Sequence, residues 1–591
     1  MNCHRVARVM LGVGIALVPA GCAGPFAAKD FRSVIPTTER LRDIARVRLE
    51  EQSRTPPVTV DDAASDDLTT MLEPRAPGEE VTLSLEDVRL AALANNLDIR
   101  VALLSPSIAA TSIDEEQARF ESTFNANARW TRTDSPTSVA TEGSMIQSRN
   151  FDVGVDVPLR TGGSVAVTLP VAKTATNNPF SLLDPSYTTD VRFSIAQPLL
   201  RNAGTRVNTH AIRVAEYQHD ISATQTKLEA TRILANADRA YWRLYAAKRE
   251  LEVAQVQYEL AVEQLERARR QVDAEVAAEV EVLRAASGVA ERLERIIVTE
   301  NTVRRRGRDL RRIMNNPRLP LDADVAFVLE TQPDPLGLDL DADDLARHAI
   351  ANRMEMLELE LNLAVDASAI DFQRNQALPL FTMDYTYTVN GLDDSFRNSF
   401  GQVADRSFED WSFGLRAEVP LGNEAARARV HRAILQRLQR LATRDLREQA
   451  IRQEVFDAVD ELSQNWQRII AARQEAILAG RTYEAEQRQF DVGARTSTDV
   501  LDAASRLAEA QTREIVALTD YQITQVDIAF ATGTLLGYGR VQWDPIDLPR
   551  GDRDVRRYDR VQSADRYDEA LDADLPPLRQ HADEHRPPVR R

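Results

Sequence analysis

Two carboxylates three residues apart are the clearest candidates for a functional site in this 591-residue chain. Asp499 and Asp502 follow the segment 492–496, with the sequence VGART, which interrupts a long helical pattern. Residues three apart share one face of a helix, so the two carboxylates point the same way. Such a pair attracts cations and carries out no covalent chemistry. Taken alone, the pair is better explained as part of a solvated helix face.

A different chemistry is expected at Cys22. Two arginines precede an apolar run at residues 9–18, and small residues then lead to this cysteine. The pattern predicts an export signal peptide at residues 1–21. Cys3 is the only other cysteine, so the exported chain keeps one thiol, at its first residue. This placement resembles the acylated first residue of a bacterial lipoprotein and predicts lipid attachment (palmitate) at Cys22. An ordinary cleaved signal with an incidental cysteine is the alternative.

Nothing in the sequence predicts an enzyme. The seven histidines are scattered without the spacing of metal ligands. No phosphate-binding loop and no paired nucleophile and base occur. We therefore expect no catalysis, no metal and no cofactor. The formal net charge of −18 argues against nucleic acid as a partner, because phosphate binding needs a basic surface.

The distribution of proline predicts the helices that position the carboxylates. Proline inside a helix costs about 3 kcal/mol, and none occurs in residues 199–316 or 421–544. Each of these stretches is predicted to hold a long outgoing helix and a shorter return helix. The two breaks are expected near Glu275 and Gly493. Beyond residue 22 the chain has no apolar run long enough for a transmembrane helix.

In the second stretch we expect the outgoing helix at 424–491 and the return at 496–532. A further helix, 85–119, opens the first half, so that two short helices laid end to end match one long partner. Along 451–483, apolar and small residues recur at alternating steps of four and three, with Asn465 as the one polar member. This period is typical of a coiled-coil seam. An ordinary coiled-coil spacer has the same pattern.

The segments between the helices change to an alternation with period two. A strand that is apolar on one face and polar on the other fits a membrane barrel with a wet lumen. A half-buried soluble sheet shows the same alternation. With two to four strands per repeat, a closed barrel would require several subunits. The alternating segments are 124–130, 151–157, 165–169, 191–195, 381–389 and 411–416.

The chain is predicted to be internally duplicated. Residues 271–273 match 489–491, 282–287 match 500–505, and 92–99 match 349–356. The sequence distance between matching residues becomes smaller from the start to the end of the repeat, so repeat one carries an insertion, at 135–188. This insertion lies either in a barrel wall or in an external loop. We expect a tether at 22–80, repeat one at 81–316, a connector at 317–344, repeat two at 345–540, and a charged, disordered tail at 541–591.

Together these segments resemble the outer membrane efflux protein family, the TolC-like channel-tunnels. The resemblance covers residues 82–540, and its carriers are 491–496, 499–503, 531–536 and the strand-to-helix junctions 197–201 and 419–422. It implies an α+β membrane protein in which a homotrimer shares one transmembrane β-barrel above a periplasmic α-barrel of helical hairpins. Such a protein carries solutes outward from an inner-membrane transporter and a periplasmic adaptor, in an efflux or a secretion system.

The resemblance also implies roles for residues at the helix tips. Asp499 and Asp502 match the family's constricting acidic rings, and Arg495 matches the arginine that holds the entrance closed through contacts between neighbouring hairpins. Phe490 and Glu281 are further expected gate contacts. The family commonly has tyrosine at the position of Phe490, so the gate is not carried over intact. The expected adaptor-docking tip consists of Val492, Gly493, Ala494 and Glu275, and Glu275 stands where the family has glycine.

The resemblance places the protein in the outer membrane, lipid-anchored, among outer membrane lipids and with a periplasmic helical extension. Two alternatives remain open from sequence. One is an exported coiled-coil lipoprotein that acts as a structural spacer or adaptor, although this leaves the alternating strands of both repeats unexplained. The other keeps the channel and assigns it to protein secretion in place of small-solute efflux.

Overall fold

The computed structural model describes residues 79–138, 143–275, 278–323, 325–492 and 494–541, together with Ser53 and Pro56. All except Ser53 and Pro56 belong to one structural unit, Pro74–Arg591. The predicted signal peptide, Cys22, Gly493 and nearly all of the predicted tether and tail lie outside the described residues.

Four long helices occupy most of the two proline-free stretches. The first stretch holds α8 (His210–Asp273) and α9 (Glu279–Met314), and the second holds α13 (Glu424–Asp491) and α14 (Ser497–Ala531). With 68 residues, α13 is about 100 Å long at 1.5 Å rise per residue. The bounds of α13 are those expected from the sequence, and α14 differs from its expected range only by the cap residues Thr496 and Thr532.

The prediction of a single helix at 85–119 is wrong, because this segment forms two helices, α5 (Leu85–Asn95) and α6 (Leu97–Ala118). Asn96 causes the break. Its backbone is extended, its Oδ1 accepts hydrogen bonds from the N–H groups of Asp98 and Ile99, and its Nδ2 donates to the carbonyl of Ile313. A new helix therefore starts immediately after the old one ends. The corresponding pair in the second half is α10 (Ala342–Asn352) and α11 (Met354–Gln376).

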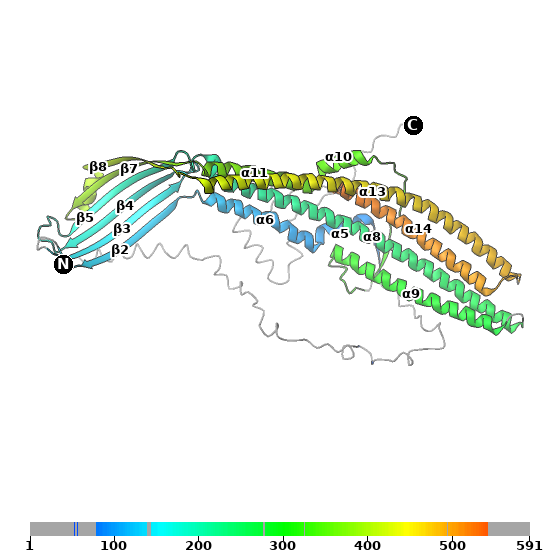
Figure 1. The fold of residues 1–591 in the computed structure, drawn as a ribbon. Coiled ribbons are helices and arrows are strands. Elements are labelled where there is room, and N and C mark those ends of the chain that lie inside the picture. Colours follow the sequence, from blue (N-terminus) through cyan, green and yellow to red (C-terminus); the bar gives the residue numbers. More distant parts are fainter. Residues whose placement is uncertain are drawn as a thin grey trace, which may run out of the picture. The chain divides into compact units, whose positions relative to one another are not determined.

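The long and short helices alternate side by side (Figure 1). Helix α8 packs against α6 and α9 on one flank and against α11 and α14 on the other. Helices α11 and α14 thus lie between α8 and α13 and contact both of them. Helix α10 packs against α13. Two short helices therefore match one long helix along its length, as the helix lengths predicted.

The predicted seam of α13 faces α14 and α11. Seven of its positions are buried, and the next three, towards the tip, are half-buried. Burying an isoleucine, valine or leucine side chain contributes about 1.5–3 kcal/mol each. The polar member, Asn465, is also buried, and its Nδ2 donates a hydrogen bond to Thr524 Oγ1 at 2.9 Å, which compensates for the loss of contact with water. The buried positions are Ile451, Val455, Ala458, Leu462, Asn465, Ile469 and Ala472.

One antiparallel sheet of six strands connects the helices, in the order β2-β3-β4-β5-β7-β8. All six alternating segments predicted from the sequence fall within these strands. The extra pair of the insertion, β3 and β4, lies in the sheet between β2 and β5, so it forms strands of the sheet and not an external loop. The strands are β2 (Thr123–Asp134), β3 (Met145–Pro158), β4 (Ser164–Thr176), β5 (Ser186–Pro198), β7 (Leu380–Asp393) and β8 (Phe408–Glu418).

The strands pair without a bulge, so side chains of one kind collect on one face. We call the face with even positions of β2 and odd positions of the other strands the apolar face. The opposite, polar face carries one row of Asn125, Gly154, Thr168, Arg192, Thr388 and Asp410. Exposed large side chains on the apolar face are Phe124, Trp130, Phe151, Val155, Val167, Tyr385, Trp411, Phe413 and Leu415.

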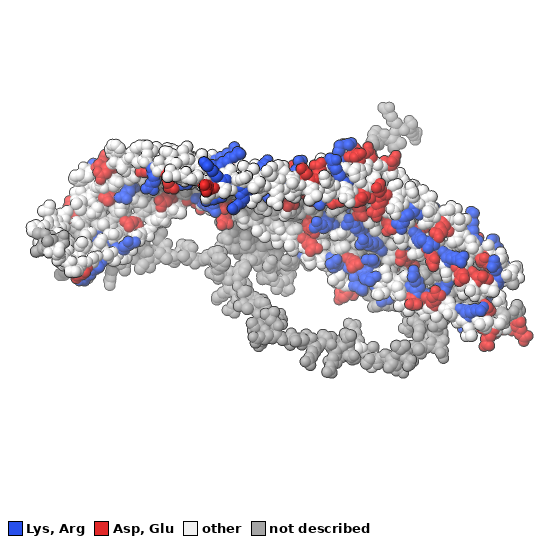
Figure 2. Space-filling model, in the orientation of Figure 1, with Lys and Arg blue, Asp and Glu red and all other residues white. Residues whose placement is uncertain are grey.

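Charged side chains are dense over the helical hairpins and sparser over the strands, on the side of the molecule seen in Figure 2. Within the described residues, no helix is both long enough and apolar enough to cross a membrane. On this side of the molecule the helical hairpins are therefore more highly charged than the sheet.

A second, small sheet was not expected, and it joins the boundary of the predicted tether and repeat one to the predicted connector. Strand β1 (Glu79–Leu83) pairs in parallel with β6 (Val325–Leu329). Phe327 of β6 joins the main core cluster with Leu234, Tyr241 and Leu310. The remaining short helices are α7 (Thr205–Asn208), α12 (Phe396–Ala404) and α15 (Leu535–Tyr538).

Candidate functional site

The turn between α13 and α14 is built by a reciprocal helix cap. Thr496 precedes α14, and its hydroxyl accepts a hydrogen bond from the N–H of Asp499. In return, Asp499 Oδ2 accepts from the backbone N–H and the hydroxyl of Thr496, each at 2.9 Å. These hydrogen bonds lower the pKa of Asp499 below its ordinary value. Asp499 is therefore ionised and held in one position at the start of the helix.

The two predicted pore carboxylates differ in their surroundings. Asp499 is half-buried, and one of its oxygens is used in the cap, whereas Asp502 is exposed. They lie three residues apart near the start of α14, and Asp499, which is in the first turn, is stabilised by the helix dipole. The structure thus brings both acids to one helix end, and gives Asp499 a structural role that the sequence analysis missed. The Thr-x-x-Asp spacing of a capping box was the readable signal.

The predicted gate contacts do not meet one another within this chain. Arg495 Nε lies 3.1 Å from Glu486 Oε2 and also donates to Gln489 Oε1, and both partners belong to α13 of the same hairpin. Glu281, in the first turn of α9, pairs with Arg284 of its own helix at 2.7 Å. Phe490 is buried at the end of α13. Arg495 therefore closes its own turn in a single chain.

The predicted docking tip consists of the two turns. Val492 and Ala494 are exposed, and the N–H of Ala494 closes the turn on the carbonyl of Gln489. Glu275 is exposed and adopts a left-handed backbone with φ of 60°. Glycine favours that conformation, so the glutamate keeps the backbone geometry of the turn and adds a charge to it. Gly493 lies outside the described residues.

A set of contacts that the sequence analysis missed joins the two hairpins just behind the turns. We call these contacts the tip latch, and define it as the pairs Gln264–Ser497, Arg267–Asp491 and Arg292–Ser505. Gln264 Nε2 donates to Ser497 Oγ at 2.9 Å in a buried position. Arg267 and Asp491 lie 3.5 Å apart at the surface. Arg292 Nη2 donates to Ser505 Oγ at 2.7 Å.

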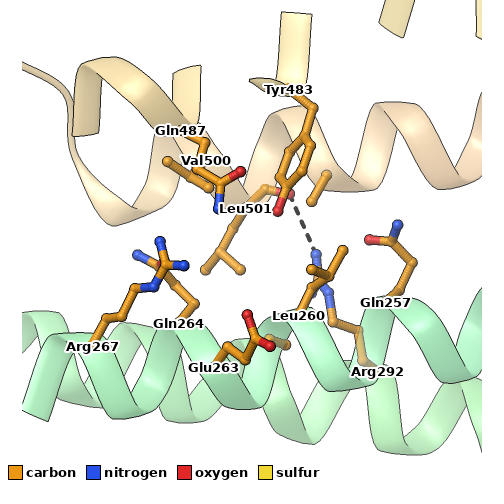
Figure 3. Close-up of a pocket in the computed structure, with 12 residues that line it drawn as sticks. Gln257, Leu260, Glu263, Gln264, Arg267, Arg292, Tyr483, Gln487, Val500 and Leu501 are labelled. Carbon is orange, nitrogen blue, oxygen red and sulfur yellow. Dashed lines mark hydrogen bonds between the residues drawn. The ribbon is translucent and has the colours of Figure 1, made fainter. Parts of the chain in front are cut away.

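Arg292 is the strongest member of the tip latch. It is buried in the seam of α9, and it also donates to the carbonyl of Leu501 at 3.4 Å (Figure 3). Gly288, one turn away, allows this approach, because a Cβ there would lie 3.3 Å from Leu501 Cδ1. A hydrogen bond from a charged donor contributes about 1.5–3 kcal/mol. The surface pair Arg267–Asp491 contributes less than about 1 kcal/mol.

A small cavity lies between the two hairpins at the latch (Figure 3). Its lining includes Tyr483 and Gln487 of α13, Glu263 of α8 and Val500 of α14. Burial raises the pKa of Tyr483, while the nearby Arg267 acts in the opposite direction. The signal that could have revealed this site is the presence of Gln264 and Arg292 at buried seam positions where apolar residues are expected.

Comparison with known proteins gives the same family as the sequence motifs. Residues 345–534 match the family model described as outer membrane efflux protein. Over 344 residues, the chain is 25% identical to the outer membrane protein TolC of Vibrio cholerae serotype O1, covering 57% of this chain and 74% of TolC.

The second half of the chain therefore matches the outer membrane efflux protein family, and the chain is similar to TolC.

Solved structures of outer membrane channels share the fold of this chain. The outer-membrane channel OprN matches with a TM-score of 0.57 at 16% identity, over 81% of this chain and 98% of OprN. The Campylobacter jejuni channel CmeC matches with a TM-score of 0.56 at 14% identity, over 80% of this chain and 88% of CmeC. The efflux family is a family of channels and not of enzymes. Among the described residues, no cluster of side chains is suited to hold a metal ion.

Proposed function

We propose that this protein is the outer membrane channel-tunnel of a tripartite efflux or secretion system, gated at the periplasmic helix tips. Solutes would enter at the tips from an inner-membrane transporter and a periplasmic adaptor, and leave through a β-barrel shared by three copies. The work of the protein is then conduction and gating, without bond-making chemistry.

The observation that carries the proposal is the six-stranded sheet. Its apolar face is uncovered over most of its area, and such a face is suited to lipid. On β7 the apolar side chains from Phe381 to Val389 extend over about 27 Å of strand, which suits a tilted strand in a bilayer. The outer edges of β2 and β8 are not paired with any strand among the described residues. Edges in lipid must be paired, so several copies would have to close the sheet.

The helices support the same assembly. On the free flank of α13, Leu435, Phe456, Ile470 and Ile477 are exposed and recur at multiples of seven residues. On α6 an exposed series, Leu97, Val101, Leu104 and Ile108, follows steps of four and three. Both series are coiled-coil seams without a partner. In the proposed trimer they would meet across the subunit boundary.

Three copies of a six-stranded sheet would form a barrel of about 18 strands, in the size class that encloses an aqueous channel. The polar face would then line this channel. The same order of helix, strands, long helix and return helix in both halves supports the internal duplication, with β3 and β4 as the additional hairpin of the first half.

At the tip, each copy would contribute Asp499 and Asp502 to a constriction of the pore that attracts cations. Gating would separate the two hairpins and break the tip latch, with Arg495, Phe490 and Glu281 as neighbouring gate contacts. Val492, Gly493, Ala494 and Glu275 would dock the adaptor. Cys22 would carry the lipid anchor, and Cys22→Ser should then abolish labelling of the protein by radioactive palmitate, whereas normal labelling would contradict the anchor.

Membrane fractionation and sizing separate this proposal from a coiled-coil spacer held by its anchor alone. A channel should require detergent for release even as Cys22→Ser, and should run as a trimer. A spacer would become soluble when the anchor is lost. The exposed apolar face of the sheet has no function in a spacer, which is why we favour the channel.

A further inference from the structure

One row of side chains on the apolar face of the sheet is not apolar. The strand register places Trp130 opposite Arg149, Arg149 opposite Lys173, and Lys173 opposite Tyr187. These four residues therefore form one line across β2, β3, β4 and β5, which we call the basic row. Two aromatic side chains flank two cations, and Lys173 Nζ lies 4.9 Å from the centre of the Tyr187 ring.

The two cations are in an unfavourable arrangement without an anion. Arg149 and Lys173 are direct cross-strand neighbours, and like charges in this position repel each other. Neither makes an ion pair with any acid in the described part of the chain. Asp152 and Asp156 of β3 point to the opposite, polar face. Arg132, on the same face two residues beyond Trp130, adds a third positive charge.

The nearest acid of the row is already in use. Asp393 lies opposite Tyr187, and its two carboxylate oxygens accept hydrogen bonds from the side chains of Asn398 and Gln402 of α12. Asp393 keeps its negative charge, but it lies two strands away from Lys173 and forms no ion pair with it. Arg149 and Lys173, which have no acidic partner among the described residues, are left for an anion from outside the chain.

The row marks the boundary of the apolar band. Phe151 and Val171 lie two residues from Arg149 and Lys173 on the same strands and the same face. The band of apolar side chains starts with these two residues. The row lies at the ends of the strands that are remote from the helices, because β2 follows α6 and Trp130 is near the end of β2. In the proposed channel this is the outer surface of the membrane, where tryptophan and tyrosine are favoured at the interface.

Helix α12 supports this level as an interface. It packs on the same face at the remote ends of β5 and β7, where the hydroxyls of Ser399 and Thr189 lie 3.0 Å apart in a buried position. Its outer side exposes Phe396 and Phe400, one turn apart. A short amphipathic helix with exposed phenylalanines suits the boundary between headgroups and acyl chains.

We propose that the basic row is a binding site for the phosphate groups of anionic lipids in the outer leaflet, with Arg149 and Lys173 as the phosphate ligands. Trp130 and Tyr187 fix the depth of the row at the headgroup level. The site rests on the proposed function, because it needs the apolar face in contact with lipid. It goes beyond that function in giving the extra hairpin, β3 and β4, a specific lipid.

The test compares two lipids on the full-length protein in phosphatidylcholine vesicles. Spin-labelled phosphatidylglycerol and spin-labelled phosphatidylcholine report which lipid is immobilised at the protein surface. The test variant is Arg149→Gln with Lys173→Gln. The matched control is Arg129→Gln with Arg192→Gln, which removes the same charge from the polar face of the same sheet.

We expect wild type and control to prefer phosphatidylglycerol, and the test variant to lose about fivefold of that preference for each cation removed. An equal preference in test variant and wild type would overturn the proposal. Loss of the preference on adding excess inorganic phosphate to wild type would also overturn it, in favour of a site for free anions.

Two further measurements on the same samples separate this site from the proposed function. Protein that floats with the vesicles and conducts ions, but shows no lipid preference, would overturn the basic row alone. Protein that neither floats nor conducts would overturn the channel and the lipid site together.

Discussion

Arg292 of α9 donates a hydrogen bond of 2.7 Å to the hydroxyl of Ser505 on α14, and this bond joins the two hairpins of the chain. Arg292 is buried, so this bond is largely shielded from solvent. Of the three pairs in the tip latch, this one combines a charged donor with burial. If the gate opens by separation of the hairpins, this contact is the one whose loss should matter most.

Arg292→Met is therefore expected to favour the open gate. It keeps an apolar stem in the seam but removes a charge-assisted bond worth about 1.5–3 kcal/mol, so the open probability should rise at least about tenfold. Single-channel recording in planar bilayers measures this. Arg295→Met on the exposed side of α9 is the control, and an open probability that is equal in both variants would remove Arg292 from the gate.

The acid pair predicts sensitivity to divalent cations. Asp499→Ala with Asp502→Ala should weaken block of the conductance by divalent cations, because carboxylate rings attract them. Thr496→Ala is the control that disturbs the cap of α14 and keeps both charges. If block is unchanged in the double variant, the two acids do not line the pore.

The lowered pKa of Asp499 predicts how the tip responds to acid. A carboxyl group with a lower pKa in the folded than in the unfolded chain stabilises the fold fully above its unfolded pKa, near 3.9. This contribution is lost as pH falls through the folded pKa. Wild type should therefore be more stable than Asp499→Asn at neutral pH. The difference between their unfolding temperatures should become smaller as the pH falls below about 4. Thermal unfolding across pH tests this, and a constant difference down to the lowest pH would contradict it.

The hairpin of β3 and β4 is expected to set the width of the exit. Deletion of residues 145–176 joins two loops at the same end of the sheet and leaves β2 antiparallel to β5, so a narrower barrel can still close. Uncharged polymers added on the outer side should then be excluded from the mouth at a smaller size than in wild type. The same size limit in both proteins would show that the hairpin is not part of the closed wall.

Local patterns predicted the long elements well. The absence of proline and the steps of four and three located α13 and its seam, because a helix of this length depends on continuous local rules. The alternation with period two located the strands in the same way. The break at Asn96 was missed because its cause is a cap whose amide also reaches the distant Ile313.

Contacts between distant segments were not predictable from the pattern. The pairing of β1 with β6 joins residues far apart in the sequence, and nothing local marks Glu79–Leu83 as its partner. The tip latch is similar, because Arg292 and Ser505 are ordinary residues until the two hairpins are placed side by side. The carboxylates Asp499 and Asp502 could be named from sequence, but the commitment of Asp499 to Thr496 depends on the geometry of the turn.

The central claim is that one chain is an incomplete wall and that only an assembly makes a passage. Ile470→Asp with Ile477→Asp places charge in the exposed seam of α13, whereas Gln464→Asp with Ala471→Asp, the control, places charge on another exposed side of that helix. The most direct measurement is the single-channel conductance of the purified proteins in a planar bilayer. Wild type and control should form trimers with discrete conductance steps, and the seam variant should give neither. Stable single chains of wild type without conductance would contradict the account.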